Sequence, residues 1–149
     1  MIYEQAMKQI QNIIEKEKNP LKKVVDYLQT TFGAYTWVGI YLVKNNNLYL
    51  GPWKGPHATE HTKIPIGYGI CGAAAETGKI ENIADVRDDP RYLSCFISTR
   101  SEIVVPITFK EIIIGEIDID SDKINAFGHD DEIFLKKIAD MLAEHIHNS

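Results

Sequence analysis

The chain has 149 residues, of which 44% are hydrophobic and 25% are charged. This length and balance fit one globular domain with a hydrophobic core and exclude a chain that is disordered throughout. The net charge of −5 and the scattered lysines and arginines argue against nucleic-acid binding, because nucleic-acid binders usually carry a basic stripe. No segment approaches the roughly 18–20 consecutive apolar residues of a membrane span, so we expect no membrane partner.

The N-terminus and the cysteine content both indicate a cytoplasmic protein. The first residues are polar and periodic, without the apolar stretch and small-residue cleavage site of a signal peptide. The two cysteines, Cys71 and Cys95, are too few for a disulfide-stabilised secreted scaffold. We therefore expect a cytoplasmic location, where thiols stay reduced.

Residues 1–31 predict two helices. Apolar residues recur at helical spacing as far as Ile14, and the pair Asn19–Pro20 interrupts the run. Pro20 suits the first position of a helix, because it has no backbone N–H to leave unpaired and its φ is already helical. We expect this second helix to end near Phe32 and Gly33.

Residues 35–120 predict the strands of a sheet and the loops around a pocket. The expected elements are a strand over 35–43, its hairpin partner over 48–50, a loop over 51–65, a short helix over 67–78 capped by Gly78, a strand over 80–84 and a second hairpin over 102–120. The loop prediction rests on the three prolines and two glycines between Gly51 and Pro65.

An apolar stripe between residues 129 and 147 predicts a C-terminal helix. Successive strands with helices at both ends indicate the α+β class, built on a central antiparallel sheet. We expect a single domain over residues 1–149, with the terminal helices on one face of the sheet. The loop and the short helix are expected to cover the other face and to enclose a ligand pocket.

Cys71 follows two closely spaced glycines at the start of the predicted short helix. Unpaired backbone N–H groups and the helix dipole stabilise an anion there, which lowers the pKa of a thiol. The alternative is a small buried apolar residue in a helix that is otherwise rich in glycine and alanine. The sequence leaves both interpretations open.

Cys95 lies in a segment that is predicted to be neither helix nor strand. Arg91 and Arg100 flank it in the sequence and favour a thiolate. Loops carry functional residues more often than core strands do. The alternative interpretation is an incidental, half-buried cysteine.

Asp118 and Asp120 alternate with isoleucines in the last predicted strand, and Glu116 shares their face. If this face is exposed, the carboxylates are simply solvated. If it faces the covered pocket, burial raises the pKa of at least one of them, which then suits proton donation or the binding of an ammonium group. Glu102 begins the neighbouring strand and is expected to join them.

We expect no metal site and no tightly bound cofactor. His57 and His61 are four residues apart, but they lie in a loop that contains proline, where that spacing does not put them on one face. No third or fourth ligand accompanies them in the pattern that zinc usually requires.

Four short runs carry a family resemblance: Trp37 to Tyr41, Gly69-Ile-Cys71-Gly, Ser101-Glu-Ile-Val and Asp118-Ile-Asp120-Ser. Their order and spacing over residues 30–140 resemble those of the free methionine-(R)-sulfoxide reductases, which are stand-alone GAF-domain enzymes. The resemblance implies the GAF fold. It also implies thiol-dependent reduction of free L-methionine (R)-S-oxide to methionine.

The resemblance implies unequal roles for the two cysteines. Cys95 resembles the cysteine that attacks the sulfoxide sulfur and becomes a sulfenic acid, and Cys71 resembles its partner, which condenses with it to a disulfide. Thioredoxin is then the external reductant. Members of the family usually carry a third cysteine, which this chain lacks.

The resemblance also implies residues that bind the substrate. Trp37 and Tyr41 resemble the aromatic wall around the methyl-sulfinyl group. Glu102, Asp118 and Asp120 resemble the acids that hold the ammonium group and assist protonation of the leaving oxygen.

Three functions therefore stay open. The first is the reductase, and the second is a non-catalytic GAF sensor that binds a small molecule and needs neither thiol. The third is a structural or partner-binding module that dimerises through the terminal helices. We expect a homodimer.

Overall fold

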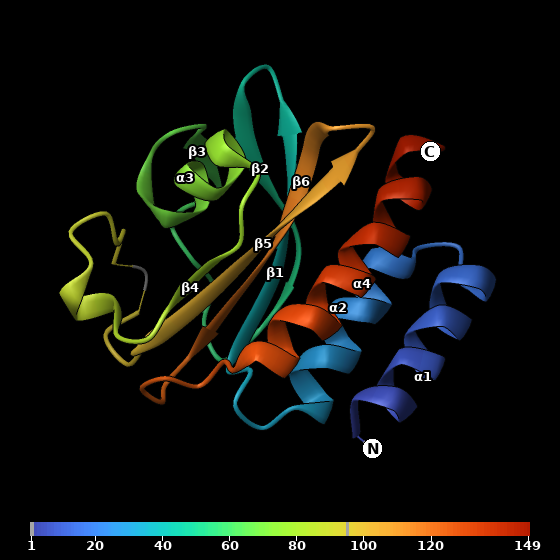
Figure 1. Ribbon diagram of the computed structural model, residues 1–149, viewed down its shortest axis with the longest axis horizontal. Coiled ribbons are helices and arrows are strands. Elements are labelled where there is room, and N and C mark those ends of the chain that lie inside the picture. Colours follow the sequence, from blue (N-terminus) through green and yellow to red (C-terminus); the bar gives the residue numbers. More distant parts are fainter. Residues whose placement is uncertain (1, 95) are drawn as a thin grey trace.

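The computed structural model describes residues 2–94 and 96–149, and within them six strands form one antiparallel sheet in the order β3-β2-β1-β6-β5-β4 (Figure 1). The strands are β1 (Trp37–Lys44), β2 (Asn47–Lys54), β3 (Lys63–Pro65), β4 (Glu81–Ile83), β5 (Ser101–Phe109) and β6 (Ile112–Ser121). Strands β1 and β6, which lie far apart in the sequence, pair at the centre of the sheet. This pairing brings the two halves of the chain together.

Two tight hairpins build the centre of the sheet. Asn45 and Asn46 join β1 to β2 with φ values of 51° and 62°, and Lys110 and Glu111 join β5 to β6 with φ values of 49° and 68°. Two consecutive residues with positive φ match the right-handed twist of the paired strands. The two predicted hairpins are thus confirmed.

Three helices cover one face of the sheet. Helix α2 (Pro20–Thr31) packs on β1 and β2, α4 (His129–His147) packs on β5 and β6, and α1 (Ile2–Lys16) lies against α2 and α4 (Figure 1). The main hydrophobic core fills this layer and includes Ile117 and Ile119 of β6. The predicted placement of the terminal helices on one face is confirmed.

The other face of the sheet is covered by helix α3 (Gly69–Thr77), which has a second, smaller hydrophobic cluster beneath it (Figure 1). The helix ends at Gly78 in the left-handed conformation, as predicted, with a φ of 73°. A short 3₁₀ helix, Val86–Asp88, follows β4. The α+β class and the predicted layers, with α3 over the second face, are confirmed.

The prediction of a loop throughout residues 51–65 is wrong at both ends. Strand β2 continues to Lys54, because the register with β1 shifts by one residue between Leu50 and Trp53 and this bulge accommodates Pro52. Strand β3 pairs with β2 at the edge of the sheet, where Pro65 disrupts no further strand. Only the stretch between these two strands, residues 55–62, is a loop.

Within the described residues, no helix has both the length and the apolar character that crossing a membrane requires.

Candidate functional site

The site begins as three rows of side chains that run across strands β5, β6 and β1 beneath α3. Directly paired residues of antiparallel strands point to the same face. The rows, each given in the order β5, β6, β1, are Glu102–Asp120–Trp37, Val104–Asp118–Gly39 and Pro106–Glu116–Tyr41. The five residues predicted to bind the substrate, Trp37, Tyr41, Glu102, Asp118 and Asp120, therefore lie on one small surface together with Glu116.

The four acids of this surface, Glu102, Glu116, Asp118 and Asp120, are all buried, with exposed fractions of 0–5%. Burial is the largest cause of a raised pKa in every one of them, because a carboxylate loses its hydration there. The negative charge of Asp118 raises the pKa of its three neighbours further. Of the two alternatives left open for the acidic face of the last strand, the structure has the buried one, on the side that α3 covers.

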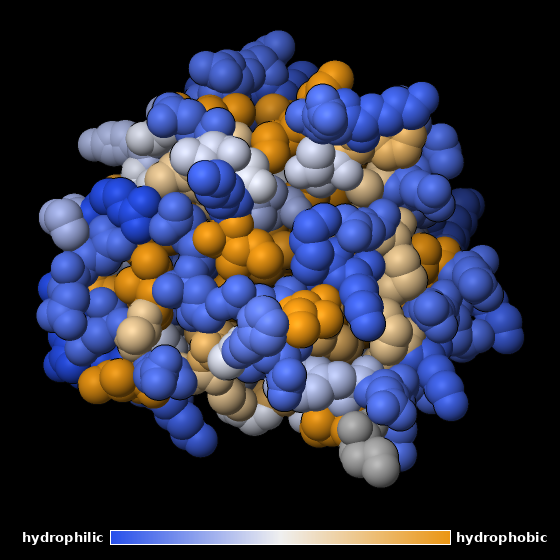
Figure 2. Space-filling model, viewed as in Figure 1, coloured by the Kyte–Doolittle hydropathy of each residue, from blue (hydrophilic) through white to orange (hydrophobic). Residues whose placement is uncertain are grey.

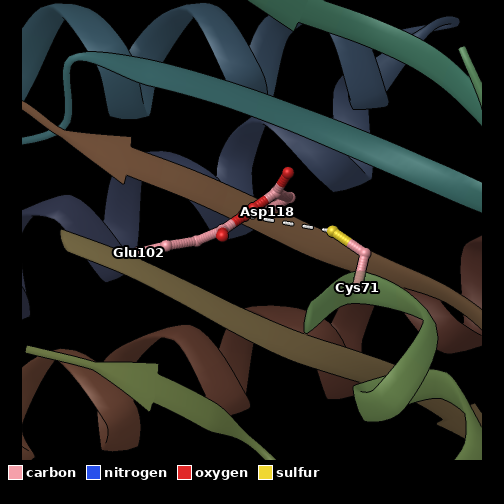
Figure 3. Close-up of side chains that lie close together, drawn as sticks. All are labelled: Cys71, Glu102 and Asp118. Carbon is pink, nitrogen blue, oxygen red and sulfur yellow. Dashed lines mark hydrogen bonds between the residues drawn. The ribbon is translucent and has the colours of Figure 1, made fainter. Parts of the chain in front are cut away.

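Cys71 approaches these acids from the first turn of α3 (Figure 3). Its thiol is free and buried, and it donates a hydrogen bond to Glu102 Oε2 over 4.0 Å. Burial, and then the charges of Asp118 and the other acids, hold the pKa of this thiol well above its usual value. Of the two interpretations left open for Cys71, the buried residue without a lowered pKa is the one that holds, because desolvation and four nearby acids outweigh the helix dipole.

A small cavity lies between α3, its flanking loops and the sheet. Its volume is about 20 Å³, room for roughly one water molecule. The residues that line it are Tyr41, His61, Ile64, Cys71, Leu93, Glu102 and Asp118. Four of the residues predicted for the site therefore meet at one cavity, and Asp120 extends the acidic row beside it.

Tyr41 ties the loop of residues 55–62 to the sheet. Its hydroxyl donates a hydrogen bond to the backbone oxygen of His61 over 2.7 Å. The His61 ring lies 3.4 Å, Nε2 to oxygen, from the backbone of Ser94 in the next covering segment. These contacts close the loop over the cavity.

Trp37 is buried beside the cavity rather than in its lining. Its ring lies over Gly39, where an added Cβ would approach it to 2.4 Å, so only glycine fits there. It stacks on Trp53 with ring centroids 6.2 Å apart and meets Phe96 at 6.0 Å. Its Nε1 has no hydrogen-bond partner among the described residues.

Cys95, the predicted nucleophile, lies outside the described residues. The two arginines that flank it in the sequence have other partners. Arg91 pairs with Glu81 and Asp89 at N–O distances of 2.8 and 2.7 Å, and Arg100 donates to the backbone oxygens of Ile97 and Thr99.

Two polar residues of the site, Glu116 and His61, are not among the predicted binding residues. Glu116 is fully buried, and neither of its carboxyl oxygens has a hydrogen-bond partner in the described part of the chain. The alternation of residues in the last strand places Glu116 on the acidic face, and this is the signal that the sequence offers. For His61, nothing in the local sequence indicates that its loop folds over the cavity.

Comparison with known proteins identifies the family. The sequence pattern of the GAF domain family matches residues 19–146. The chain belongs to the GAF domain family. A GAF domain-containing protein A from Dictyostelium discoideum is 38% identical over 144 residues, which cover 94% of this chain and 89% of that relative.

Two solved structures make the relationship of this GAF domain more specific. A type II free methionine-R-sulfoxide reductase from Thermoplasma acidophilum is 40% identical with a TM-score of 0.84, over 91% of this chain and 96% of that one. A free methionine-R-sulfoxide reductase from Neisseria meningitidis, solved in complex with its substrate, is 33% identical with a TM-score of 0.91, over 97% and 88% of the two chains. The resemblance found in the sequence is confirmed.

Proposed function

We propose that this GAF domain reduces free L-methionine (R)-S-oxide to methionine. The observation that carries the proposal is the buried row of acids beside Cys71, in a chain similar to reductases of this class. Burial raises the pKa of Glu102 and Asp120, so each holds its proton to a higher pH than an exposed acid does. Such a group suits the protonation of a sulfoxide oxygen as it leaves.

In the proposed reaction, the Cys95 thiol attacks the sulfoxide sulfur and takes up its oxygen. Methionine and a sulfenic acid on Cys95 are the products of this step. The sulfenic acid then condenses with the Cys71 thiol, which forms a disulfide and releases water. Thioredoxin, as the external dithiol, reduces the disulfide, restores both thiols and is itself oxidised.

The raised pKa of Cys71 supports its assignment as the cysteine that condenses with the sulfenic acid, and not as the one that attacks the substrate. The thiolate is the attacking form of a cysteine, and burial among acids disfavours a thiolate at Cys71. The neighbours of Cys95 in the sequence support its access to the same pocket, since Leu93 lines the cavity and the Phe96 ring meets Trp37.

For the substrate, we propose that Glu102, Asp118 and Asp120 bind the ammonium group. A carboxylate in a buried site gains a partner when a cation enters, so binding relieves the cost of burying the acid. Trp37 and Tyr41 are the proposed aromatic wall. A pocket closed by a loop admits a free amino acid and excludes the same residue within a peptide.

We further propose a cytoplasmic homodimer that associates through the terminal helices and needs no bound cofactor. Helices α1 and α4 form a groove with apolar side chains, among them Met7, Ile133 and Phe134. Ile133 is 44% exposed. The same face of the molecule is otherwise mostly hydrophilic, with separate hydrophobic patches (Figure 2).

The test is a coupled assay with thioredoxin, thioredoxin reductase and NADPH, to which the R and S epimers of free methionine sulfoxide are added separately. We expect NADPH oxidation with the R epimer. No oxidation with either epimer, in a preparation that binds methionine sulfoxide, contradicts the reductase and favours a non-catalytic sensor.

Two cysteine variants separate the roles of the thiols. Cys95→Ser is expected to form no methionine. Cys71→Ser is expected to form roughly one methionine per chain and then stop, because the sulfenic acid has no partner thiol. Full turnover by Cys95→Ser would show that the assignment of the nucleophile is wrong.

A further inference from the structure

In their ionised forms the four buried acids carry four negative charges, which a single ammonium group does not balance. Glu102, Glu116, Asp118 and Asp120 are buried on one face of the sheet, and all four lie near Cys71. The ion pairs of the described residues all lie elsewhere, at the surface, and involve none of these four acids. A substrate ammonium group supplies one positive charge, whereas a divalent cation supplies two.

The arrangement of the donor atoms fits such a cation. The sulfur of Cys71 and one oxygen each of Glu102 and Asp118 all lie within 4.8 Å of one another (Figure 3). The Cys71 sulfur and Glu102 Oε2 are 4.0 Å apart. Zinc bonds to sulfur and oxygen in a tetrahedral site place these two ligand atoms about 3.5 Å apart, so a small side-chain movement is sufficient.

Two further observations point to a ligand at this position. Asp118 Oδ1 is buried and has no hydrogen-bond partner among the described residues. The cavity beside these donors has a volume of about 20 Å³. This is room for roughly one water molecule beside a cation that is held among the three donor atoms.

We propose that Cys71, Glu102 and Asp118 bind a soft divalent cation of the zinc type, with a water molecule in the fourth position. The mixed donor set selects among cations, because thiolate sulfur favours zinc over magnesium or calcium. The three ligands together carry three negative charges, which is one more than the two positive charges of the cation. Binding of the cation at this site does not depend on the proposed reductase reaction.

Binding requires the thiolate form of Cys71. The cation replaces the thiol proton, and the Glu102 and Asp118 carboxyls lose any proton that they still hold. These protons pass to water, and no electron is transferred. A bound cation therefore occupies the thiol that the proposed reaction uses as the second cysteine.

The test uses cobalt as a spectroscopic probe on the full-length chain with Cys95→Ser, which leaves Cys71 as its single thiol. We expect a sulfur-to-cobalt charge-transfer band, with the visible bands of a tetrahedral site, that saturates at about one cobalt per chain. Added zinc should abolish these bands by displacement, and magnesium should not. Absence of the charge-transfer band, or equal displacement by magnesium, would overturn the proposal.

Ligand variants in the same background identify the donors. Cys71→Ala is expected to abolish the band. Glu102→Gln and Asp118→Asn are each expected to weaken cobalt binding at least about tenfold, because even the loss of a residue that only hydrogen-bonds to a metal ligand weakens binding about 10- to 100-fold. The matched control is Asp140→Asn, an exposed residue of α4, which should bind cobalt as tightly as its parent. Unchanged affinity in both Glu102→Gln and Asp118→Asn would exclude the site. Since the readout is optical, it is independent of whether the chain reduces methionine sulfoxide.

Discussion

Cys71 lies in the first turn of helix α3, a position that normally stabilises a thiolate, yet its surroundings have the opposite effect. A helix dipole is equivalent to about half an elementary charge. Opposed to it are full desolvation and four carboxyl groups on the sheet below. At the scale of the residue, tertiary neighbours therefore decide the chemistry of this thiol.

Glu116 permits a direct measurement of what burial does to the acids. Its pKa is raised, mainly by burial, so the folded chain holds this proton at a pH where the unfolded chain has lost it. Stability therefore falls as pH rises from the unfolded pKa through the folded one. We expect Glu116→Gln to remove this loss. At about pH 8 its free energy of unfolding should exceed that of the parent by about 1.4 kcal/mol for each unit by which folding raises the pKa of Glu116.

Thermal unfolding at several pH values checks the prediction. At about pH 3.5, below the pKa of glutamate in the unfolded chain, this acid is protonated in both states, and the parent and Glu116→Gln should unfold at similar temperatures. The control is Glu15→Gln on exposed α1, which should change stability little at either pH. A Glu116→Gln protein that is no more stable than the parent at the higher pH would contradict the prediction.

At the scale of the elements, Asp131 joins three parts of the fold. Its carboxylate accepts a hydrogen bond from the backbone N–H of Gly128 over 2.8 Å, which caps the start of α4. It also accepts from the hydroxyls of Tyr35, over 2.5 Å, and Tyr3, over 3.2 Å. One side chain thus connects α4 to α1 and to the segment that enters β1.

We expect Asp131→Ala to lower the free energy of unfolding by about 2–4 kcal/mol, because it removes a cap and leaves the buried Tyr35 hydroxyl without its acceptor. Denaturant titration measures this change. The matched control is Asp130→Ala, an exposed acid in the same helical turn. If both variants lose the same small amount, the network around Asp131 contributes little.

At the scale of the whole molecule, the covering layer must move before the pocket can admit an amino acid. The cavity of about 20 Å³ is far too small for methionine sulfoxide. The loop of residues 55–62 is held over it by the Tyr41 hydroxyl and the His61 backbone oxygen. Opening this loop is the smallest change that reaches the buried acids.

We expect Tyr41→Phe to speed hydrogen exchange in residues 55–62 roughly 2- to 10-fold, since the loss of one hydrogen bond changes local stability by about 0.5–1.5 kcal/mol. Exchange followed by mass spectrometry gives the rate for this segment. Tyr27→Phe on α2 is the control and should leave the loop unchanged. Equal exchange in Tyr41→Phe and the parent would show that other contacts hold the loop closed.

The proposed homodimer is a second property of the whole molecule. Ile133 lies in the groove between α1 and α4, so Ile133→Asp should place a charge in the proposed interface and produce monomers. Light scattering measures the mass of the parent and the variant. A parent that is monomeric at all concentrations contradicts the dimer directly. That one domain extends over residues 1–149 also stays a prediction.

The amino-acid sequence by itself determined the helices, the two hairpins and the alternation of acids and isoleucines in the last strand. These features depend on local chemistry: Pro20 at a helix start, asparagines with positive φ in a turn, and the period of two in a strand. The bulge at Pro52 escaped prediction, because the residues around Pro52 do not reveal that β2 shifts its register on β1 there.

Only the tertiary structure decided what the acids and Cys71 have around them. The pairing of β1 with β6 and of β6 with β5 sets Glu102 opposite Asp120, and α3 then buries both beneath Cys71. Burial and mutual charge are properties of residues distant in sequence, so no local pattern reveals the resulting pKa. The sequence determined which acids are present and on which face of the strand they lie. Long-range pairing decided that these acids and Cys71 are buried and close together.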